Sequence, residues 1–344
     1  MSEPITPNLD DSQFVRIVAA NRPCRHGGLR LETETLTHGA QSTHIFHHYG
    51  HGGCGVTLAF GTAAHVADLI AEVAPAEEST ASSPSIAVLG AGVVGLTTAW
   101  TLAQRGYRVR IVTERMAADT TSQVAGALWA PTGIDMGDDD ASMARFDALL
   151  HRSQSILRSL DPEHWAYQTL PVCEPEGAPD TPRLFATGAI DPPVPVERLP
   201  IGGPPRSGRV FMTEFIHTPR FLRVLADEVR QLGVSIDTAT VRSPDDVSTL
   251  PESLVVNCLG LGSRDVFGDT AMYAARGVLV HMKPQQLGYI VHDGYRYMFP
   301  REDALILGGC FMPDADTDTH DATIAAEILA HHRAFFASNA RVNA

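Results

Sequence analysis

Residues 85–95 read Ser-Ile-Ala-Val-Leu-Gly-Ala-Gly-Val-Val-Gly, and this stretch decides the fold. Its apolar opening is typical of a short buried strand, and a helix is expected to follow over residues 93–105. Gly90, Gly92 and Gly95 stand at the junction in the pattern G-x-G-x-x-G. The first glycine permits a tight turn, the second a close backbone approach to a pyrophosphate, and the third close packing of the helix on the strand. The stretch therefore predicts a βαβ unit that binds a dinucleotide.

The residues around this motif support the same prediction. Unpaired N–H groups at the start of the helix, where Val93 and Val94 stand, attract phosphate groups. A second strand is expected over residues 108–114, and the carboxylate of Glu114 at its end can accept hydrogen bonds from ribose hydroxyls. An acid at this position implies a ribose with a free 2′-hydroxyl, which disfavours NADP because NADP carries a phosphate there. From this unit alone, NAD and FAD both stay open as the nucleotide.

Composition excludes several kinds of partner. The chain has 344 residues, 44% of them hydrophobic, which is enough for two domains with substantial cores. Its formal net charge of −14 is opposite to the basic surface that nucleic acids and anionic membranes require. We therefore expect neither of them as a partner.

The cysteines, histidines and N-terminal residues predict a cytoplasmic protein without metal. Five scattered cysteines without a C-x-x-C pair argue against disulfides and structural zinc, and indicate a reducing compartment. Residues 1–11 lack the apolar segment of a signal peptide, and no window is expected to reach the roughly 18 apolar residues of a spanning helix. No acid or cysteine accompanies the dense histidines at ligand spacing, so they predict no metal site; they are His44, His47, His48 and His51.

Further segments divide the chain. Residues 71–85 are rich in Ala, Ser, Pro and Glu and predict an exposed linker. Residues 171–209 are dense in proline, which excludes helix interiors and central strands. Other helices are expected near 11–20, 56–71 and 218–232, and other strands near 29–34, 43–47, 234–240, 254–258, 277–282 and 304–307.

The segment Thr120-Thr-Ser-Gln-Val-Ala-Gly-Ala-Leu-Trp-Ala-Pro131 resembles the flavin loop of the D-amino acid oxidase family, whose members bind FAD. The resemblance covers most of the chain, is weakest over residues 136–208, and implies FAD as the cofactor. Further motifs follow in the family's order, at residues 217–222, 255–260, 276–277, 297–301 and 307–309.

Three motifs stand outside that order. In this family the chain ends with an arginine-proline motif, a strand, a glycine-rich flavin loop and a helix. Here Arg22-Pro-Cys-Arg25, residues 29–32 and residues 47–57 resemble those features near the beginning. The chain therefore resembles a circularly permuted D-amino acid oxidase in which the linker joins the two former ends. The alternative is an unrelated N-terminal domain, which the matching spacing of three motifs disfavours.

The fold class that the resemblance implies is α/β. A Rossmann-like FAD-binding domain is expected beside an α+β substrate-binding domain with a mixed sheet. Residues 44–70, 85–135 and 209–265 are assigned to the FAD-binding domain, residues 1–43, 136–208 and 266–344 to the substrate-binding domain, and residues 71–84 to the linker.

The resemblance also implies three catalytic residues. Arg22 matches the arginine that holds the substrate carboxylate, and a planar charged fork suits that task. Tyr297 matches the tyrosine that hydrogen-bonds the same carboxylate, and Gly53 matches the glycine whose carbonyl receives the substrate amine. For Arg22 the alternatives are a surface ion pair and a structural cover over a chain turn, and for Tyr297 a packed aromatic whose hydroxyl reaches a backbone group.

The residues expected to hold FAD lie in the two glycine-rich stretches, the flavin loop and nearby strand ends. They are Gly52, Gly53, Gly55, Val56, Thr57, Gly90, Gly92, Val93, Val94, Gly95, Glu114, Arg115, Thr120, Thr121, Ser122, Gly126, Leu128, Val241 and Gly260.

The implied reaction is the oxidation of an amino acid. A hydride passes from the α-carbon to flavin N5, dioxygen is the expected electron acceptor, and the products are an imino acid and hydrogen peroxide. Three alternatives stay open: an oxidase or a dehydrogenase of another amine or cyclic imino acid, and a flavin-binding protein without turnover. A homodimer is one assembly that the resemblance allows.

Three positions depart from the family pattern. Asp293 stands where some relatives have a second active-site tyrosine, and Tyr295 is a candidate replacement. Leu259 stands where a hydroxyl residue can occur. Cys54 occupies a position that is often aromatic; a covalent flavin link and a small packing residue are the two interpretations, and we expect the second.

Overall fold

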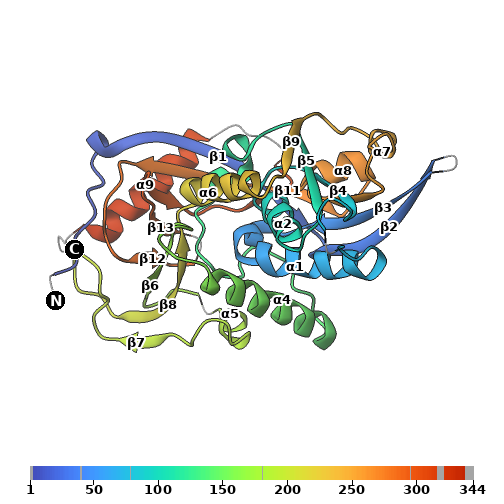
Figure 1. Cartoon of the computed structure of the whole chain (residues 1–344). Helices are drawn as coiled ribbons and strands as arrows, with labels where there is room; N and C mark the ends of the chain where they lie inside the picture. Colours follow the sequence, from blue (N-terminus) through green and yellow to red (C-terminus); the bar gives the residue numbers. More distant parts are fainter. Residues whose placement is uncertain are drawn as a thin grey trace.

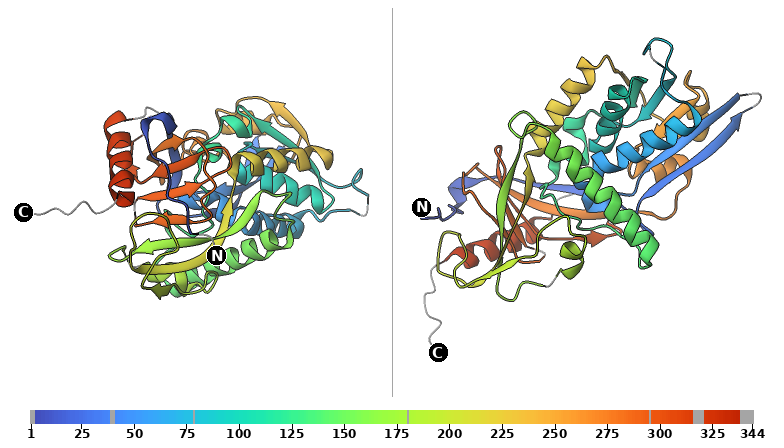
Figure 2. Two further views of the ribbon diagram at one scale, coloured as in Figure 1. Left: turned by 90° about the vertical axis from the view of Figure 1, so that its left-hand side faces the viewer. Right: turned by 60° about the horizontal axis from the view of Figure 1, so that its bottom comes forward.

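Two β-sheets, each flanked by helices, make up the molecule (Figure 1). The computed structural model describes residues 3–38, 41–77, 79–179, 181–294, 296–315 and 321–337. Segments from the start and the middle of the chain contribute to both sheets, whereas the described strands from residue 272 onward all lie in the nine-stranded sheet (Figure 2).

The first sheet has six strands and contains the predicted βαβ unit. Strands β3, β10, β4, β5 and β9 run parallel, and β2 pairs antiparallel with β3 at the edge. The central strands are apolar and buried, as expected for a parallel sheet that is covered on both faces. In order across the sheet the strands are β2 (Arg30–His38), β3 (Gln41–Tyr49), β10 (Leu254–Asn257), β4 (Ser85–Leu89), β5 (Arg108–Thr113) and β9 (Ser235–Thr238).

Helices α1, α2, α4 and α6 pack together beside this sheet. A Cβ atom at Gly61 of α1 would lie 2.0 Å from the carbonyl oxygen of Leu149 in α4, so glycine permits the close helix contact. The aromatic rings of Phe60, Trp100 and Trp165 fill the space between the helices. The bounds are α1 (Gly55–Val73), α2 (Val93–Gln104), α4 (Asp140–Ser159) and α6 (Thr218–Gln231).

The second sheet has nine strands and is mixed, as the sequence predicts. Helix α9 (Ala322–Phe336) packs against its strands β11 and β14. Eight strands follow in the order β1 (Phe14–Arg25), β11 (Met272–Met282), β14 (Leu305–Gly308), β13 (Tyr297–Pro300), β12 (Ile290–His292), β6 (Tyr167–Pro175), β8 (Gly208–Ile216) and β7 (Val194–Val196), and β15 (Met312–Pro313) pairs with β11.

Short helices complete the described fold. They are η1 (Asp11–Gln13), η2 (Gly52–Cys54), η3 (Ala117–Asp119), α3 (Thr121–Val124), α5 (Pro182–Ala186), α7 (Pro244–Ser248) and α8 (Gly262–Phe267).

Most of the expected elements are confirmed, but the helix expected near residues 11–20 is wrong. Those residues lead into strand β1, whose partner β11 lies at the other end of the chain. The exclusion of central strands from the proline-rich region is also wrong, because Pro171 lies inside β6. Strand β12 pairs only with Val172 and Cys173 of β6, so Pro171 has a partner strand on one side alone.

Two expectations about exposure are corrected. The linker is partly packed: Ser83 is buried, and its hydroxyl accepts a hydrogen bond from the Glu77 N–H (2.9 Å). Residues 52–73 are long and apolar enough to span a membrane, contrary to the expected absence of such a window. However, 67% of that window is buried inside the protein, as in the core helix of a globular fold.

The sheets do not follow the expected domain boundaries throughout. Strand β2 lies in the six-stranded sheet, although residues 1–43 were assigned to the substrate domain. Strand β8 lies in the nine-stranded sheet, although residues 209–265 were assigned to the FAD-binding domain. The assignment of the other segments stays a prediction.

Candidate active site

The glycine-rich loop after β4 has the geometry that its sequence predicts. Gly90 has φ = +98°, which favours glycine, and a Cβ atom there would lie 2.8 Å from the carbonyl oxygen of Cys258. A Cβ atom at Gly95 would lie 2.0 Å from the carbonyl oxygen of Gly90, so helix and strand could not pack with any larger residue. By contrast, a Cβ atom at Gly92 would meet only the hydroxyl of Ser122, at 3.4 Å. The face of Gly92 is thus open for a ligand.

The flavin loop reaches the start of α2 at this open face. The Val93 N–H, in the first turn of α2, donates to the Ser122 hydroxyl (3.1 Å), and Val94 follows in the same turn. A polar atom from the loop therefore lies beside the positive end of the helix, where a phosphate would bind. Thr120 and Thr121 precede Ser122 at the start of α3. An open glycine backbone and a helix N-terminus fit the pyrophosphate of FAD.

The glycine-rich turn before α1 lies against the same place. A Cβ atom at Gly55 would be 3.4 Å from Cγ1 of Val93, so the N-termini of α1 and α2 are adjacent. The Thr57 hydroxyl donates to the carbonyl oxygen of Ala130 (3.2 Å), and the partly buried Val56 packs against the core. The structure thus brings together two glycine-rich stretches that are far apart in the sequence.

Gly53 packs against Thr132 and Gly133, the two residues that follow the flavin loop. Its N–H donates to the carbonyl oxygen of Gly133 (2.8 Å), and a Cβ atom there would be 2.6 Å from the carbonyl oxygen of Thr132. In the preceding residue, Gly52, φ is +54°. The turn is therefore close-packed, and its backbone is held in place on one side.

Arg22 and Tyr297 come together on the nine-stranded sheet. The Arg22 guanidinium lies over Gly277 of β11, where a Cβ atom would be 2.8 Å from Nη1. Nη1 also donates to the carbonyl oxygen of Cys310 (3.4 Å). Burial raises the pKa of the Tyr297 hydroxyl, and the positive charge and a hydrogen bond of Arg22 partly oppose this. A permanent cation and a neutral hydroxyl donor thus lie side by side.

The remaining residues expected to hold FAD lie near the edges of this region. Glu114 and Arg115 follow β5 and Val241 follows β9, so all three lie beyond the carboxyl ends of parallel strands. In α/β sheets this edge is where ligands bind. Gly260 has φ = +58°. A Cβ atom there would lie 3.5 Å from the side chain of Pro23, the neighbour of Arg22.

Gly126 and Leu128 connect the flavin loop to the nine-stranded sheet. A Cβ atom at Gly126 would lie 2.5 Å from Cδ2 of Phe299, so only glycine permits this contact. Leu128 forms a β-bridge with Phe215. Both residues place the loop between the sheets.

Arg301 is a residue of this region for which the sequence alone suggested no role. Its side chain is only 2% exposed, and Nη1 donates to the carbonyl oxygens of Ala125 (2.9 Å) and Gln123 (3.3 Å). Nη1 also donates to the Thr218 hydroxyl (3.1 Å), and Nη2 to Asp303 (2.7 Å). Arg301 thus fixes the backbone of the flavin loop. Its place in the motif at 297–301 was the only available signal.

The departures from the family pattern have local explanations. Asp293 accepts a hydrogen bond from His331 of α9 (2.7 Å), whereas Tyr295 lies outside the described residues. The Leu259 N–H donates to the side-chain oxygen of Asn257 (3.1 Å). Burial raises the pKa of the Cys54 thiol, whose Sγ donates to the carbonyl oxygen of Thr132 (2.9 Å), so the position holds a packed neutral thiol.

The clustered histidines have separate hydrogen-bond partners. His47 pairs with Glu34 (2.9 Å), and the rings of His48 and His51 contact the hydroxyls of Thr98 and Thr62. Within the described parts of the chain, no group of three metal-ligating side chains is present. All five cysteines are free.

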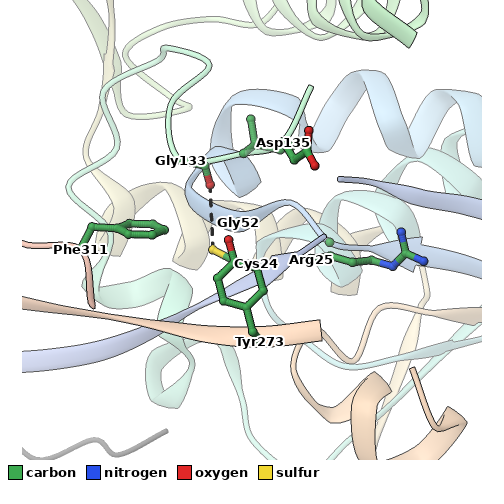
Figure 3. Close-up of a pocket in the computed structure, with 9 residues that line it drawn as sticks. Cys24, Arg25, Gly52, Gly133, Asp135, Tyr273 and Phe311 are labelled. Atoms are coloured by element: carbon green, nitrogen blue, oxygen red, sulfur yellow. Dashed lines mark hydrogen bonds between the residues drawn. The ribbon is translucent and has the colours of Figure 1, made fainter. Parts of the chain in front are cut away.

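A cavity of about 300 Å³ lies next to Gly52 and Gly133 (Figure 3). Its wall includes the ring of Phe311, which also lies 5.5 Å from Cζ of Arg22. The remaining lining residues are Cys24, Arg25, Gly50, Ile134, Asp135 and Tyr273.

Comparison with known proteins agrees with this arrangement. Residues 85–344 match the model of the family described as DAO, FAD dependent oxidoreductase. The chain therefore belongs to this family of FAD-dependent oxidoreductases. A D-amino-acid oxidase from Streptomyces coelicolor is 30% identical over 71% of this chain and 75% of its own length.

Solved structures show the same fold. Glycine oxidase from Bacillus cereus has a TM-score of 0.58 at 16% identity, with 72% of this chain and 78% of that chain covered. L-proline dehydrogenase from P. horikoshii has a TM-score of 0.54 at 16% identity, with 74% and 76% covered. At this identity the likeness concerns the fold alone.

Proposed function

We propose that this protein oxidises an amino acid, in the manner of a D-amino acid oxidase, to an imino acid and hydrogen peroxide. The observation that carries the proposal is the pairing of the Arg22 guanidinium with the Tyr297 hydroxyl beside the glycine-rich turn. FAD, when bound, supplies the hydride acceptor. The 30% sequence identity to a D-amino-acid oxidase supports an amino acid as the substrate.

The protein's own residues bind and orient the substrate. Arg22 holds the carboxylate through two charge-assisted hydrogen bonds, and Tyr297 donates a third. The carbonyl of Gly53 accepts a hydrogen bond from the amine, which fixes the α-carbon between the two anchors. Because the Tyr297 pKa is raised, its hydroxyl stays a donor throughout the neutral pH range. No side-chain base is needed in this arrangement.

We also propose that the order of segments is a circular permutation of the family's. The family model begins to match at residue 85, and the earlier segment supplies β1 to the nine-stranded sheet and β2 and β3 to the six-stranded sheet. The two described ends also lie close together, since Nε of Arg333 donates to the carbonyl oxygen of Leu9 (2.8 Å). Such proximity is what a permutation requires.

Anaerobic flavin reduction tests the proposed activity. The FAD-loaded protein is mixed with D- and L-amino acids, glycine, proline and simple amines, and bleaching at the flavin absorption band is followed. Rapid bleaching by amino acids of one configuration, with peroxide release in air, is the expected result. Bleaching only by secondary or cyclic amines would redirect the assignment to another amine, and no bleaching by any of them would refute turnover.

A further inference from the structure

The cavity shown in Figure 3 borders the proposed catalytic groups. It is lined by Gly52, the neighbour of Gly53, and by Phe311, whose ring contacts the Arg22 guanidinium. Cys24 follows Arg22 by two residues in β1, so the two side chains point to the same face of the sheet. The cavity therefore lies within reach of the side chain of a substrate held by Arg22 and Gly53.

Asp135 brings a negative charge to the cavity wall. Its carboxylate accepts hydrogen bonds from the N–H groups of Gly137 (3.0 Å) and Gly27 (2.9 Å), which lower the pKa of the carboxyl. Asp135 is thus an anion at neutral pH. The positive charge of Arg183 acts on it from nearby, but among the described residues the ion pair of Arg183 is with Asp138.

Arg25, the cation in the cavity wall, is already neutralised. Nε donates to Asp269 (2.9 Å), and Nη1 lies 3.4 Å from the carbonyl oxygens of His26 and Gly28. Asp269 is nearly buried and also accepts a hydrogen bond from Tyr49 (2.7 Å). An anionic substrate group would have to compete with this buried carboxylate, which disfavours it.

The Tyr273 hydroxyl in the cavity wall lies in the field of nearby negative charges. Its pKa is raised by burial first, then by Cys24, and further by the charges of Asp135 and Asp314. Two carboxylates therefore act on this hydroxyl in the cavity wall.

We propose that this cavity is the side-chain subsite for a cationic amino acid of lysine or arginine length, and that Asp135 selects the charge. The proposal rests on the proposed function and names its substrate class. Strand β1 rises roughly 10 Å from Arg22 to Arg25. The Asp135 carboxylate lies at the Arg25 end of this strand, because it accepts a hydrogen bond from the Gly27 N–H. A substrate whose carboxylate is held by Arg22 therefore needs a long side chain to contact Asp135.

The test compares charged substrates with neutral ones of similar length. In the FAD-loaded enzyme, kcat/KM is measured for lysine and arginine against norleucine and methionine, each in both configurations, in the wild type, Asp135→Asn and Asp140→Asn. Asp140 is an exposed residue in the first turn of α4, outside the cavity lining, and serves as the matched control. We expect Asp135→Asn to lower kcat/KM about two- to fivefold for the cationic substrates alone. The wild-type preference also declines as salt is added, because the charge lies near solvent.

The outcomes separate the two proposals. An equal loss for all substrates would identify Asp135 as a structural support of the Gly27 and Gly137 turns and would overturn the subsite. Turnover of neutral amino acids with no preference for cations would overturn it as well, yet leave amino acid oxidation intact. If none of the amino acids reduces the flavin, the proposed function itself fails.

Discussion

Arg22 reaches the site from strand β1, and its guanidinium is close to the hydroxyl of Tyr297. Arg22→Ala is expected to lower kcat/KM for amino acids by the equivalent of about 2–5 kcal/mol, because a charge-assisted pair is lost. The flavin spectrum and the melting temperature are expected to change little. Steady-state kinetics with an amino acid and with the matching amine that lacks the carboxylate provide the measurement.

The amine serves as the internal control in this experiment. The loss must be confined to the substrate with a carboxylate, and Arg22→Lys restores only part of it, since a lysine cannot form the bidentate pair. Equal losses for both substrates would show that Arg22 stabilises the fold and does not anchor the carboxylate.

Substitutions at Gly92 and Gly95 are expected to affect different properties, FAD binding at the first and folding stability at the second. A Cβ atom at Gly92 would meet only the Ser122 hydroxyl, so Gly92→Val is expected to fold but to bind no FAD, because the side chain occupies the approach of the pyrophosphate. Gly95→Ala instead places a methyl 2.0 Å from a backbone oxygen and is expected to lower the melting temperature of the apoprotein. Flavin absorbance and thermal unfolding distinguish the two. A yellow Gly92→Val protein would contradict the assignment.

Strand β13 carries Tyr297 at one end and leads into Arg301, which holds the flavin loop. Arg301→Met leaves buried carbonyl oxygens without donors, which typically costs about 1–3 kcal/mol for each group. We expect weaker FAD binding, measured by titration of the apoprotein, with kcat of the fully loaded enzyme nearly unchanged. The double variant Arg301→Met/Asp303→Asn tests whether the effect arises because Asp303 is left without its ion pair. If FAD affinity were unaltered, the loop would be held by other contacts.

The turn before α1 contains His51, whose ring is buried and contacts the Thr62 hydroxyl (3.1 Å). Burial lowers the pKa of His51 from the usual 6.5 to about 3, so the folded protein keeps the ring neutral. Above pH 6.5 the unfolded chain is neutral there too, and the full stability is present. Below that pH only the unfolded chain gains the proton, so stability declines as pH falls toward 3, by about 1.4 kcal/mol per pH unit.

Chemical denaturation of the wild type and of His51→Gln, each at pH 7 and pH 5, measures this linkage. The variant is expected to be less stable at pH 7 but to lose less stability on acidification. An identical loss in both proteins would assign the acid sensitivity to other buried groups, such as His48.

The arrangement of the whole chain predicts that the segments can be reordered. A protein that begins at residue 85, continues to 337 and then, through a Gly/Ser linker, runs from 3 to 77 is expected to fold and to bind FAD. The short distance between Arg333 and Leu9 makes the new connection feasible. A variant opened inside β11 is the control and is expected to fail, because β11 pairs with both β1 and β14. If the reordered protein bound no flavin, the permutation would lose its support.

The sequence predicts the six-stranded sheet and its glycine loop well, because apolar runs and G-x-G-x-x-G report local requirements. Strand β1 was missed because its residues are only half-buried and its partner lies at the far end of the chain. Helix α4 was missed although Asp139 caps its N-terminus through the Ser142 N–H (2.9 Å). Arg301 acts through backbone carbonyls, and no residue pattern marks such a contact.

The pairing of β1 with β11 affects how the protein is made. Strand β1, 12 residues long, is translated long before β11, and among the described strands β11 is its one ladder partner. The nascent polypeptide therefore presents β1 without a ladder partner until β11 has been made. We expect its yield in cells to depend on chaperones that bind extended segments.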